Sequence, residues 1–215
     1  RPLLFGSGPE VGVKPAMEYT FIVFVTPVGP YFKEGFKPVN MMICRDFDRA
    51  APKGTGTFKV GGNYAASLRA VIDAKNKGYS NPLFLDSREK KYIDECGAAN
   101  FFGIKNNTYV TPRSESILNS VTNMSLLEIA ADMGMKTERR PIPVEELGTF
   151  EEAGACGTAA VITPIAKIFD PETNTVYEYT KDCLPGPLTV KLYNKLVSIQ
   201  NGDEPDTFGW MSVVE

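Results

Sequence analysis

The segment Gly54–Tyr64 reads GTGTFKVGGNY and contains the residue in this chain that is best suited to chemistry. Lys59 has uncharged neighbours and shortly precedes the glycine pair Gly61 and Gly62. A lysine acts as a nucleophile when partial desolvation keeps its amine neutral near pH 7. Paired glycines let a bulky ligand approach the backbone. The ordinary alternative is a lysine at a strand end that extends to water, and local features alone favour that alternative.

Two further segments combine small residues with polar ones. Residues 93–100 read IDECGAAN, where Glu95 stands beside small residues against which a flat ring could lie. Residues 157–160 read GTAA, where Thr158 offers a hydroxyl. The start of a helix near Val121 would expose backbone N–H groups that favour an anion. The competing interpretations are a surface glutamate, an ordinary turn and an ordinary helix cap.

The 215-residue chain contains no histidine. Ser-His-Asp hydrolysis, His-ligated zinc and His general-base catalysis are therefore excluded unless residues outside this sequence supply the imidazole. Lysine, tyrosine, carboxylates or a cofactor must do any chemistry. The four cysteines lie far apart and form no CxxC pair, so no metal site and no disulfide framework are expected. The same cysteine usage favours a cytoplasmic protein.

The net charge and the hydropathy of the chain limit the classes of partner that it could bind. A formal charge of -3 and a pI near 5.3 argue against a nucleic-acid partner. The longest apolar stretch, residues 19–28, is too short for a bilayer, so no membrane partner is expected. Residues 1–12 read RPLLFGSGPEVG, which has the composition of a link between domains and leads us to expect a missing N-terminal part.

Periodicity predicts an alternation of strands and helices along the chain. The run YTFIVFV, residues 19–25, predicts a buried strand, and Leu68 and Ile72 belong to the apolar positions that predict the first helix. The order predicts an α+β fold with mixed or antiparallel strands. Strands are expected at 19–25, 39–44, 82–86, 99–105, 109–111, 165–169 and 175–179, helices at 62–78, 120–133 and 188–199, and a short helical turn at 144–147.

The stretch KVGGNY and its helix resemble the Schiff-base lysine motif of class IV aminotransferases, specifically of the branched-chain amino acid aminotransferase family. RPLLFGSGP, PVGPYF, ECGAAN, GTAAVITP and the closing GW also appear in that family's order. The resemblance implies a fold-type IV pyridoxal phosphate enzyme, which has a mixed or antiparallel β-rich pseudo-barrel with surrounding helices. Residues 1–14 would be an interdomain linker and residues 15–215 the large cofactor-binding domain, with the small N-terminal domain missing.

The resemblance also implies how the chain would bind pyridoxal 5′-phosphate. Lys59 would hold the cofactor as a Schiff base and, once freed, would move the proton between the substrate Cα and the cofactor C4′. Glu95 would partner the pyridine nitrogen, and Tyr64 would hydrogen-bond the phenolic oxygen. The other implied cofactor residues are Arg49, which supports this region, and Val121, Thr122 and Thr158, which contact the phosphate.

The implied activity is transamination of branched-chain L-amino acids (leucine, isoleucine and valine) with 2-oxoglutarate through the Schiff base on Lys59. Tyr31 would line the side-chain pocket, and the amides of Ala159 and Ala160 would bind the substrate carboxylate. An aliphatic pocket selects such side chains because each buried methylene is worth roughly 0.8 kcal/mol. The partners would be amino acids and 2-oxo acids, in a cytoplasmic homodimer of branched-chain amino acid biosynthesis.

Two alternatives remain open. The same fold serves D-amino acid aminotransferases and aminodeoxychorismate lyases. A chain without the small domain could also be an inactive domain, because that domain contributes an arginine to the phosphate site in the family.

Overall fold

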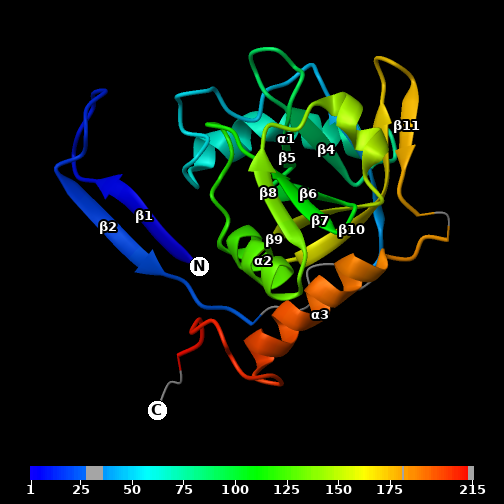
Figure 1. The fold of residues 1–215 in the computed structure, drawn as a ribbon. Helices are drawn as coiled ribbons and strands as arrows, with labels where there is room; N and C mark the ends of the chain where they lie inside the picture. Colours follow the sequence, from blue (N-terminus) through cyan, green and yellow to red (C-terminus); the bar gives the residue numbers. More distant parts are fainter. Residues whose placement is uncertain (28–35, 181, 213–215) are drawn as a thin grey trace. The chain divides into compact units, whose positions relative to one another are not determined.

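A computed structural model describes residues 1–27, 36–180 and 182–212 (Figure 1). The chain divides into two compact units, Arg1–Pro30 and Tyr31–Glu215. The domain boundary expected at residues 14 and 15 stays a prediction.

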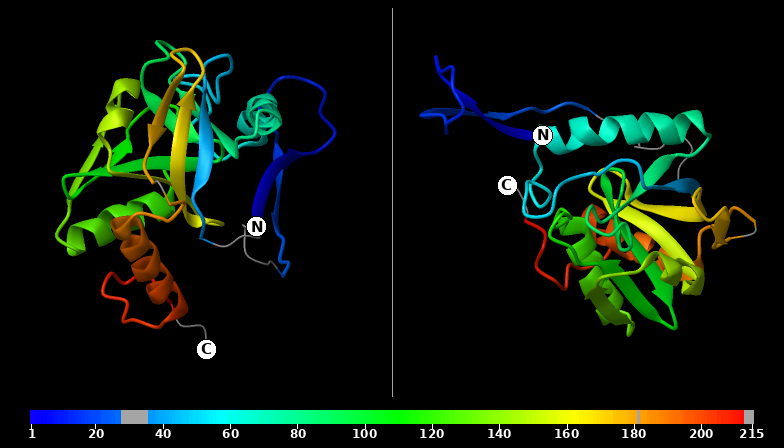
Figure 2. Two further views of the ribbon diagram at one scale, coloured as in Figure 1. Left: turned by 90° about the vertical axis from the view of Figure 1, so that its right-hand side faces the viewer. Right: turned by 90° about the horizontal axis from the view of Figure 1, so that it is seen from above.

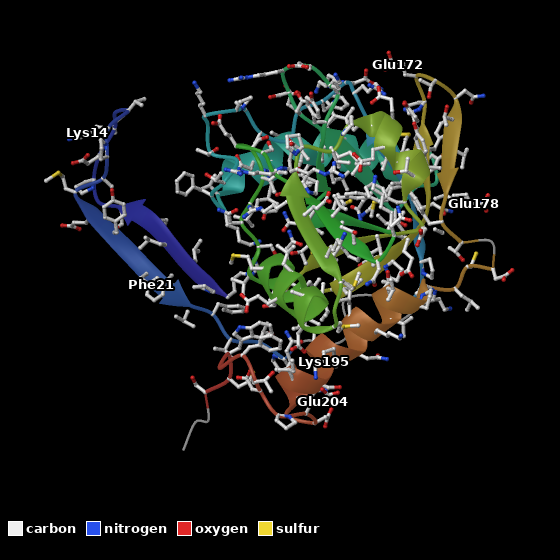
Figure 3. All side chains as sticks on the ribbon, in the orientation of Figure 1. Lys14, Phe21, Glu172, Glu178, Lys195 and Glu204 are labelled. Atoms are coloured by element: carbon white, nitrogen blue, oxygen red, sulfur yellow. The ribbon has the colours of Figure 1, made fainter. Side chains whose placement is uncertain are left out.

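The first unit is an antiparallel hairpin of β1 (Pro2–Ser7) and β2 (Glu18–Val23). The expected strand is therefore present, but the prediction that it is buried is wrong, since Tyr19 and Phe21 are exposed. A two-stranded ribbon has no second layer within its unit to cover its faces. Figure 3 labels the Phe21 side chain on this ribbon. β1 occupies part of the segment expected to be a linker.

In its described residues, the second unit combines one large sheet with three α-helices and a 3₁₀-helix. Its strands are β3 (Val39–Cys44), β4 (Asn81–Leu85), β5 (Ile93–Cys96), β6 (Ala99–Lys105), β7 (Thr108–Pro112), β8 (Lys136–Arg140), β9 (Glu152–Gly157), β10 (Val161–Asp170) and β11 (Thr175–Glu178). Its helices are α1 (Gly61–Asn76), α2 (Val121–Asp132), η1 (Val144–Thr149) and α3 (Pro187–Asn201). The expected helices are confirmed, and β5, β8 and β9 are additional to the expected strands.

The sheet closes on itself. β3 pairs in parallel with β10 and β4, and β4, β5, β6, β9 and β10 follow as antiparallel neighbours until β10 returns to β3. β11 extends the sheet from β10, and β7 and β8 extend it from β6. The result is the mixed pseudo-barrel that the fold class predicts.

Two apolar clusters lie on either side of this barrel wall. One cluster includes Met41, Leu83, Phe101 and Ile165 and joins the strands with η1. The other fills the space between the sheet and the pair α2 and α3, which pack against each other and against β9. Helix α1 packs instead on β3 and β4 and lies along the outside of the barrel (Figure 2). Among the site residues, Arg49, Lys59 and Thr158 lie on connecting segments, Glu95 lies on β5, and Tyr64 and Thr122 lie in the first turns of α1 and α2.

Helix α1 buries a different face from the one its apolar residues predict. Leu68 and Ile72 are exposed, whereas the buried positions are Asn63, Ser67, Ala70 and Ala74. Small side chains on that face permit a close approach to β4, which pure hydropathy does not reveal.

None of the helices in the described part of the chain is both long and apolar enough to cross a bilayer.

Candidate active site

The loop that carries Lys59 is held by a single buried residue of α1. Asn63 Oδ1 accepts a hydrogen bond from Thr55 Oγ1 at 2.7 Å, and its Nδ2 donates to Thr55 O at 2.7 Å and to Phe58 O at 3.0 Å. These three bonds fix both ends of the segment that precedes Lys59. They make Asn63 a residue of the site that the sequence did not single out, although it lies within the GGNY motif.

Lys59 and Tyr64 are brought together at the start of α1. Lys59 Nζ donates to Tyr64 Oη at 3.1 Å, and the lysine side chain is exposed. Side chains at Gly61 and Gly62 would enter open space, because nothing lies within 4 Å of a Cβ at either position. The amine of Lys59 is thus accessible beside a phenol, with room next to the backbone.

Arg49 joins the lysine loop to a buried carboxylate. Its Nη2 donates to Gly56 O at 3.0 Å and also to Ser116 O, while its Nε lies 3.4 Å from Glu95 Oε2. Gly56 presses so closely on the Ser116 backbone that a Cβ there would lie 2.4 Å from Ser116 O. Only glycine fits this contact, which explains one glycine of the GTGT run.

Glu95 is buried, and opposing effects set the pKa of its carboxyl group. Its Oε1 accepts a hydrogen bond from Leu118 N at 2.7 Å. Burial raises the pKa of Glu95 to about 7, although the positive charges of Arg49 and Lys59 and the Leu118 N–H lower it. Glu95 can therefore share or hold a proton near neutral pH. The structure brings Arg49 and Glu95 into direct contact, and Lys59 lies close enough for its positive charge to lower the pKa of Glu95.

The segment before α2 continues from this cluster. Asn100 Nδ2 donates to Leu118 O at 3.1 Å, and two residues later Ser120 caps α2 by accepting from Asn123 N at 3.3 Å. Of the two expected phosphate contacts, Val121 is exposed and Thr122 is buried. The backbone N–H groups at this helix start can receive an anion.

Thr158, Ala159 and Ala160 form the turn between β9 and β10. Thr158 and Ala159 are exposed and Ala160 is half-buried. Near the end of β9, Cys156 pairs with Asn100 of β6, and Asn100 also pairs with Glu95 of β5. The turn therefore begins just beyond the end of β9 that lies two strands away from Glu95. The residue after the turn, Val161, has a φ of 56°, which is a strained conformation for a β-branched side chain.

Tyr31, the expected pocket residue, lies outside the described residues. Two further residues of the cluster, Ser116 and Leu118, were not predicted. They act through backbone atoms, which no side-chain pattern in the sequence reveals.

These residues fit pyridoxal phosphate. An accessible amine, a phenol and a buried carboxylate are the donor set that this cofactor needs. Glu95 Oε2 can accept a hydrogen bond from a ring nitrogen, because its 3.4 Å separation from Arg49 Nε exceeds a normal hydrogen bond. Open space at Gly61 and Gly62 leaves room for a flat ring.

Comparison with known proteins shows which family and which solved structures this chain is similar to. Residues 1–168 match the family described as Amino-transferase class IV. The branched-chain-amino-acid aminotransferase of Helicobacter pylori strain J99 is 50% identical over 214 residues, which make up 98% of this chain and 62% of that protein. The solved branched-chain amino acid aminotransferase of Escherichia coli has a TM-score of 0.84 at 27% identity, covering 97% of this chain and 67% of that chain.

A second solved structure is the branched-chain aminotransferase of the thermophilic archaeon Thermoproteus uzoniensis with norvaline. It has a TM-score of 0.80 at 25% identity, covering 98% of this chain and 67% of that one. The chain spans less than two thirds of the length of the Helicobacter pylori relative. The match over residues 1–168 and the agreement in fold show that the chain belongs to the class IV aminotransferase family, among relatives named branched-chain amino acid aminotransferases.

Proposed function

We propose that the protein transfers the amino group of leucine, isoleucine or valine to 2-oxoglutarate, with pyridoxal phosphate held by Lys59. The observation that carries this proposal is the accessible Lys59 amine at 3.1 Å from Tyr64 Oη, in a loop that Arg49 ties to the buried Glu95. The names of the relatives support the substrate class.

The remaining residues have distinct tasks in this proposal. Glu95 would hold the ring nitrogen, Tyr64 the phenolic oxygen, and Arg49 the loop between them. The phosphate would be received by the start of α2 at Val121 and Thr122 and by the hydroxyl of Thr158. When bound, pyridoxal phosphate supplies an electron sink for the charge left by proton loss from the substrate Cα.

Lys59 carries the proton in this reaction. Once its amine is free, it can take a proton from the substrate Cα and return it to the cofactor C4′. Glu95, whose pKa is about 7, keeps a proton available at the ring nitrogen. The amides of Ala159 and Ala160 would bind the substrate carboxylate, and Tyr31 would line the aliphatic pocket.

We further propose that residues 15–215 act as the large domain of a cytoplasmic homodimer in branched-chain amino acid biosynthesis, completed by a small N-terminal domain. The length that the relatives have beyond this chain supports the second domain.

Absorbance spectra test cofactor binding. Adding pyridoxal phosphate should produce a near-visible band in the wild type and in Lys75→Ala, which changes an exposed lysine of α1, but not in Lys59→Ala. Identical spectra for wild type and Lys59→Ala would refute the assignment of Lys59.

Substrate assays with the full-length protein test the reaction. Turnover of L-leucine with 2-oxoglutarate is the expected result. Turnover of D-alanine or aminodeoxychorismate without L-leucine would assign one of the other activities of this fold, and cofactor binding without any turnover would indicate an inactive domain.

A further inference from the structure

A second buried carboxylate lies behind the candidate active site. Asp94 is 2% exposed, and its Oδ2 accepts a hydrogen bond from Ser116 Oγ at 2.6 Å. Its Oδ1 is buried without a hydrogen-bond partner in the described part of the chain. Burying a carboxylate that is only half satisfied costs stability. The proposed function gives Asp94 no task, so its presence at this buried position needs another explanation.

Ser116, the partner of Asp94, contacts the site through its backbone. Ser116 O accepts a hydrogen bond from Arg49 Nη2, and the Ser116 backbone packs directly against Gly56. Two residues further on, Leu118 N donates to Glu95 Oε1 at 2.7 Å. One short segment therefore touches the loop of Lys59, the guanidinium of Arg49 and the carboxylate of Glu95.

We infer that Asp94 and Ser116 are a pair of positioning residues that holds the Lys59 loop and Arg49 in register with Glu95. Asp94 fixes the Ser116 hydroxyl, and the Ser116 carbonyl and Cα then fix Arg49 and Gly56. Both residues are buried, and the inference assigns neither of them a contact with cofactor or substrate. The inference rests on the proposed function only in taking Lys59 and Glu95 as the groups that must be positioned.

The charges of this cluster give the Ser116 hydroxyl a second effect. Burial raises the pKa of both Asp94 and Glu95, and the positive charge of Arg49 partly offsets this rise in each, so the two carboxyl groups share the charge of one guanidinium. The hydroxyl of Ser116 gives Asp94 a partner of its own. Without that hydroxyl, Asp94 would depend more strongly on the positive charge of Arg49, at the expense of the contacts of Arg49 with Glu95 and Gly56, because a buried carboxylate needs compensation for its lost solvation.

Hydrogen exchange of the full-length, cofactor-free protein tests the inference. The Phe58 amide donates to Thr55 O at 2.9 Å inside the Lys59 loop and reports its opening. Ser116→Ala should speed exchange of this amide about tenfold, because it removes one buried hydroxyl–carboxylate bond that holds the loop. Ser116→Thr, which restores a hydroxyl, should return exchange towards the wild-type rate.

Thr189→Val is the matched control. Thr189 Oγ1 donates to the buried carboxylate of Glu152 at 2.7 Å, so this variant loses an equivalent bond elsewhere in the same unit. It should leave exchange at Phe58 unchanged. Equal acceleration at Phe58 in both variants, or none in Ser116→Ala, would overturn the inference, since the bond would then have no local effect on the loop.

Asp94→Asn keeps size and an acceptor and supports the test if Ser116→Ala does not fold. It should speed Phe58 exchange by a smaller factor, about two- to threefold, because a neutral acceptor binds the hydroxyl more weakly. In the same variant, carbon-13 spectra of the Glu95 carboxyl should show a lower pKa than in the wild type. The negative charge of Asp94 raises the pKa of Glu95, and Asp94→Asn removes that charge. Wild-type values for both measurements would count against the pair.

Failure of this inference and failure of the proposed function are distinguishable. The exchange and carbon-13 measurements need no cofactor, whereas the absorbance band lost in Lys59→Ala reports cofactor binding alone.

Discussion

Asn63 and Arg49 show how single residues define the geometry around Lys59. Asn63 holds the loop from the helix side, and Arg49 holds it from the side of Glu95. Lys59, Tyr64 and Glu95 could be predicted because they lie in motifs that resemble those of the family, and Arg49 because it matches a family arginine. It could not predict Ser116, because a backbone carbonyl is the same in every residue type and only the folded chain shows which one Arg49 meets.

Glu95 should make stability depend on pH in a direction opposite to that of most carboxylates. Its pKa rises from 4.5 to about 7 on folding, mainly because of burial. Between these values the unfolded chain is ionised while the folded one keeps its proton, so rising pH favours unfolding by up to about 3 kcal/mol. Below pH 4.5 and above pH 7 the contribution is constant.

Urea unfolding of cofactor-free Glu95→Gln and of the wild type at pH 5, 6 and 7 measures this effect. The variant should lose less stability than the wild type as pH rises. Parallel pH dependences of the two proteins would show that Glu95 titrates normally.

At the scale of elements, β9 is a strand that could not be predicted from the sequence. It reads EAGACG and lacks the bulky apolar residues that reveal β3, β4 and β6. Its small residues are required by neighbours in the folded sheet, because a Cβ at Gly154 would lie 2.4 Å from the ring of Phe102. A requirement imposed by a residue far along the chain leaves no local periodicity. The strand β8 was missed for a different reason, because it reads KTERR and its mostly exposed side chains show no apolar alternation.

Gly154→Ala should therefore destabilise the protein by about 1–3 kcal/mol through overpacking against the fully buried Phe102. Gly157→Ala on the same strand is the control, because its Cβ would make an ordinary 3.9 Å contact with Ala99. Thermal or urea unfolding of both variants compares them. Equal stability of the two variants would show that the sheet absorbs the extra methyl group.

Helix α3 begins on a carboxylate supplied by β9. Glu152 accepts hydrogen bonds from Leu188 N at 3.0 Å and from Thr189 N and Oγ1 at 2.8 and 2.7 Å. Glu152→Gln should cost about 1.5–3 kcal/mol and speed exchange in the first turn of α3, because an amide nitrogen would face donors. Glu151→Gln, at the exposed neighbouring position, should change stability by less than about 0.5 kcal/mol. Similar losses in both variants would contradict the role of Glu152.

At the scale of the whole second unit, an ion cluster links β6, β8 and η1. Glu146 accepts from Lys105 Nζ at 2.8 Å and from Arg140 Nη1 at 2.8 Å, and these cations, Arg140 first, lower its pKa to about 2. The stabilisation is complete above pH 4.5 and is lost as pH falls towards 2. Another ion pair joins Lys195 of α3 to Glu204, which follows the end of that helix; both residues are labelled in Figure 3.

Glu146→Gln should lower stability by about 1–2 kcal/mol at pH 7, since the pairs are partly solvated, and should lessen the further loss on acidification. Glu145→Gln, at an exposed position of η1, should match the wild type. Unfolding followed by circular dichroism from pH 7 to pH 2 measures both effects. An unchanged acid transition in Glu146→Gln would show that other carboxylates control it.

The closed barrel also affects how the chain behaves in a crowded solution. Strands that pair around a ring leave few unpaired backbone groups to recruit another chain, so the open edges of this large sheet are the two strands at the ends of the sheet path, β8 and β11. β8 reads KTERR, and the four-residue β11 ends in Glu178, which pairs with Lys167 at 3.1 Å. Short length and charge are the features that discourage edge-to-edge association. Replacing the charges of β8 with threonine or valine would turn that strand into a template for intermolecular β-sheet.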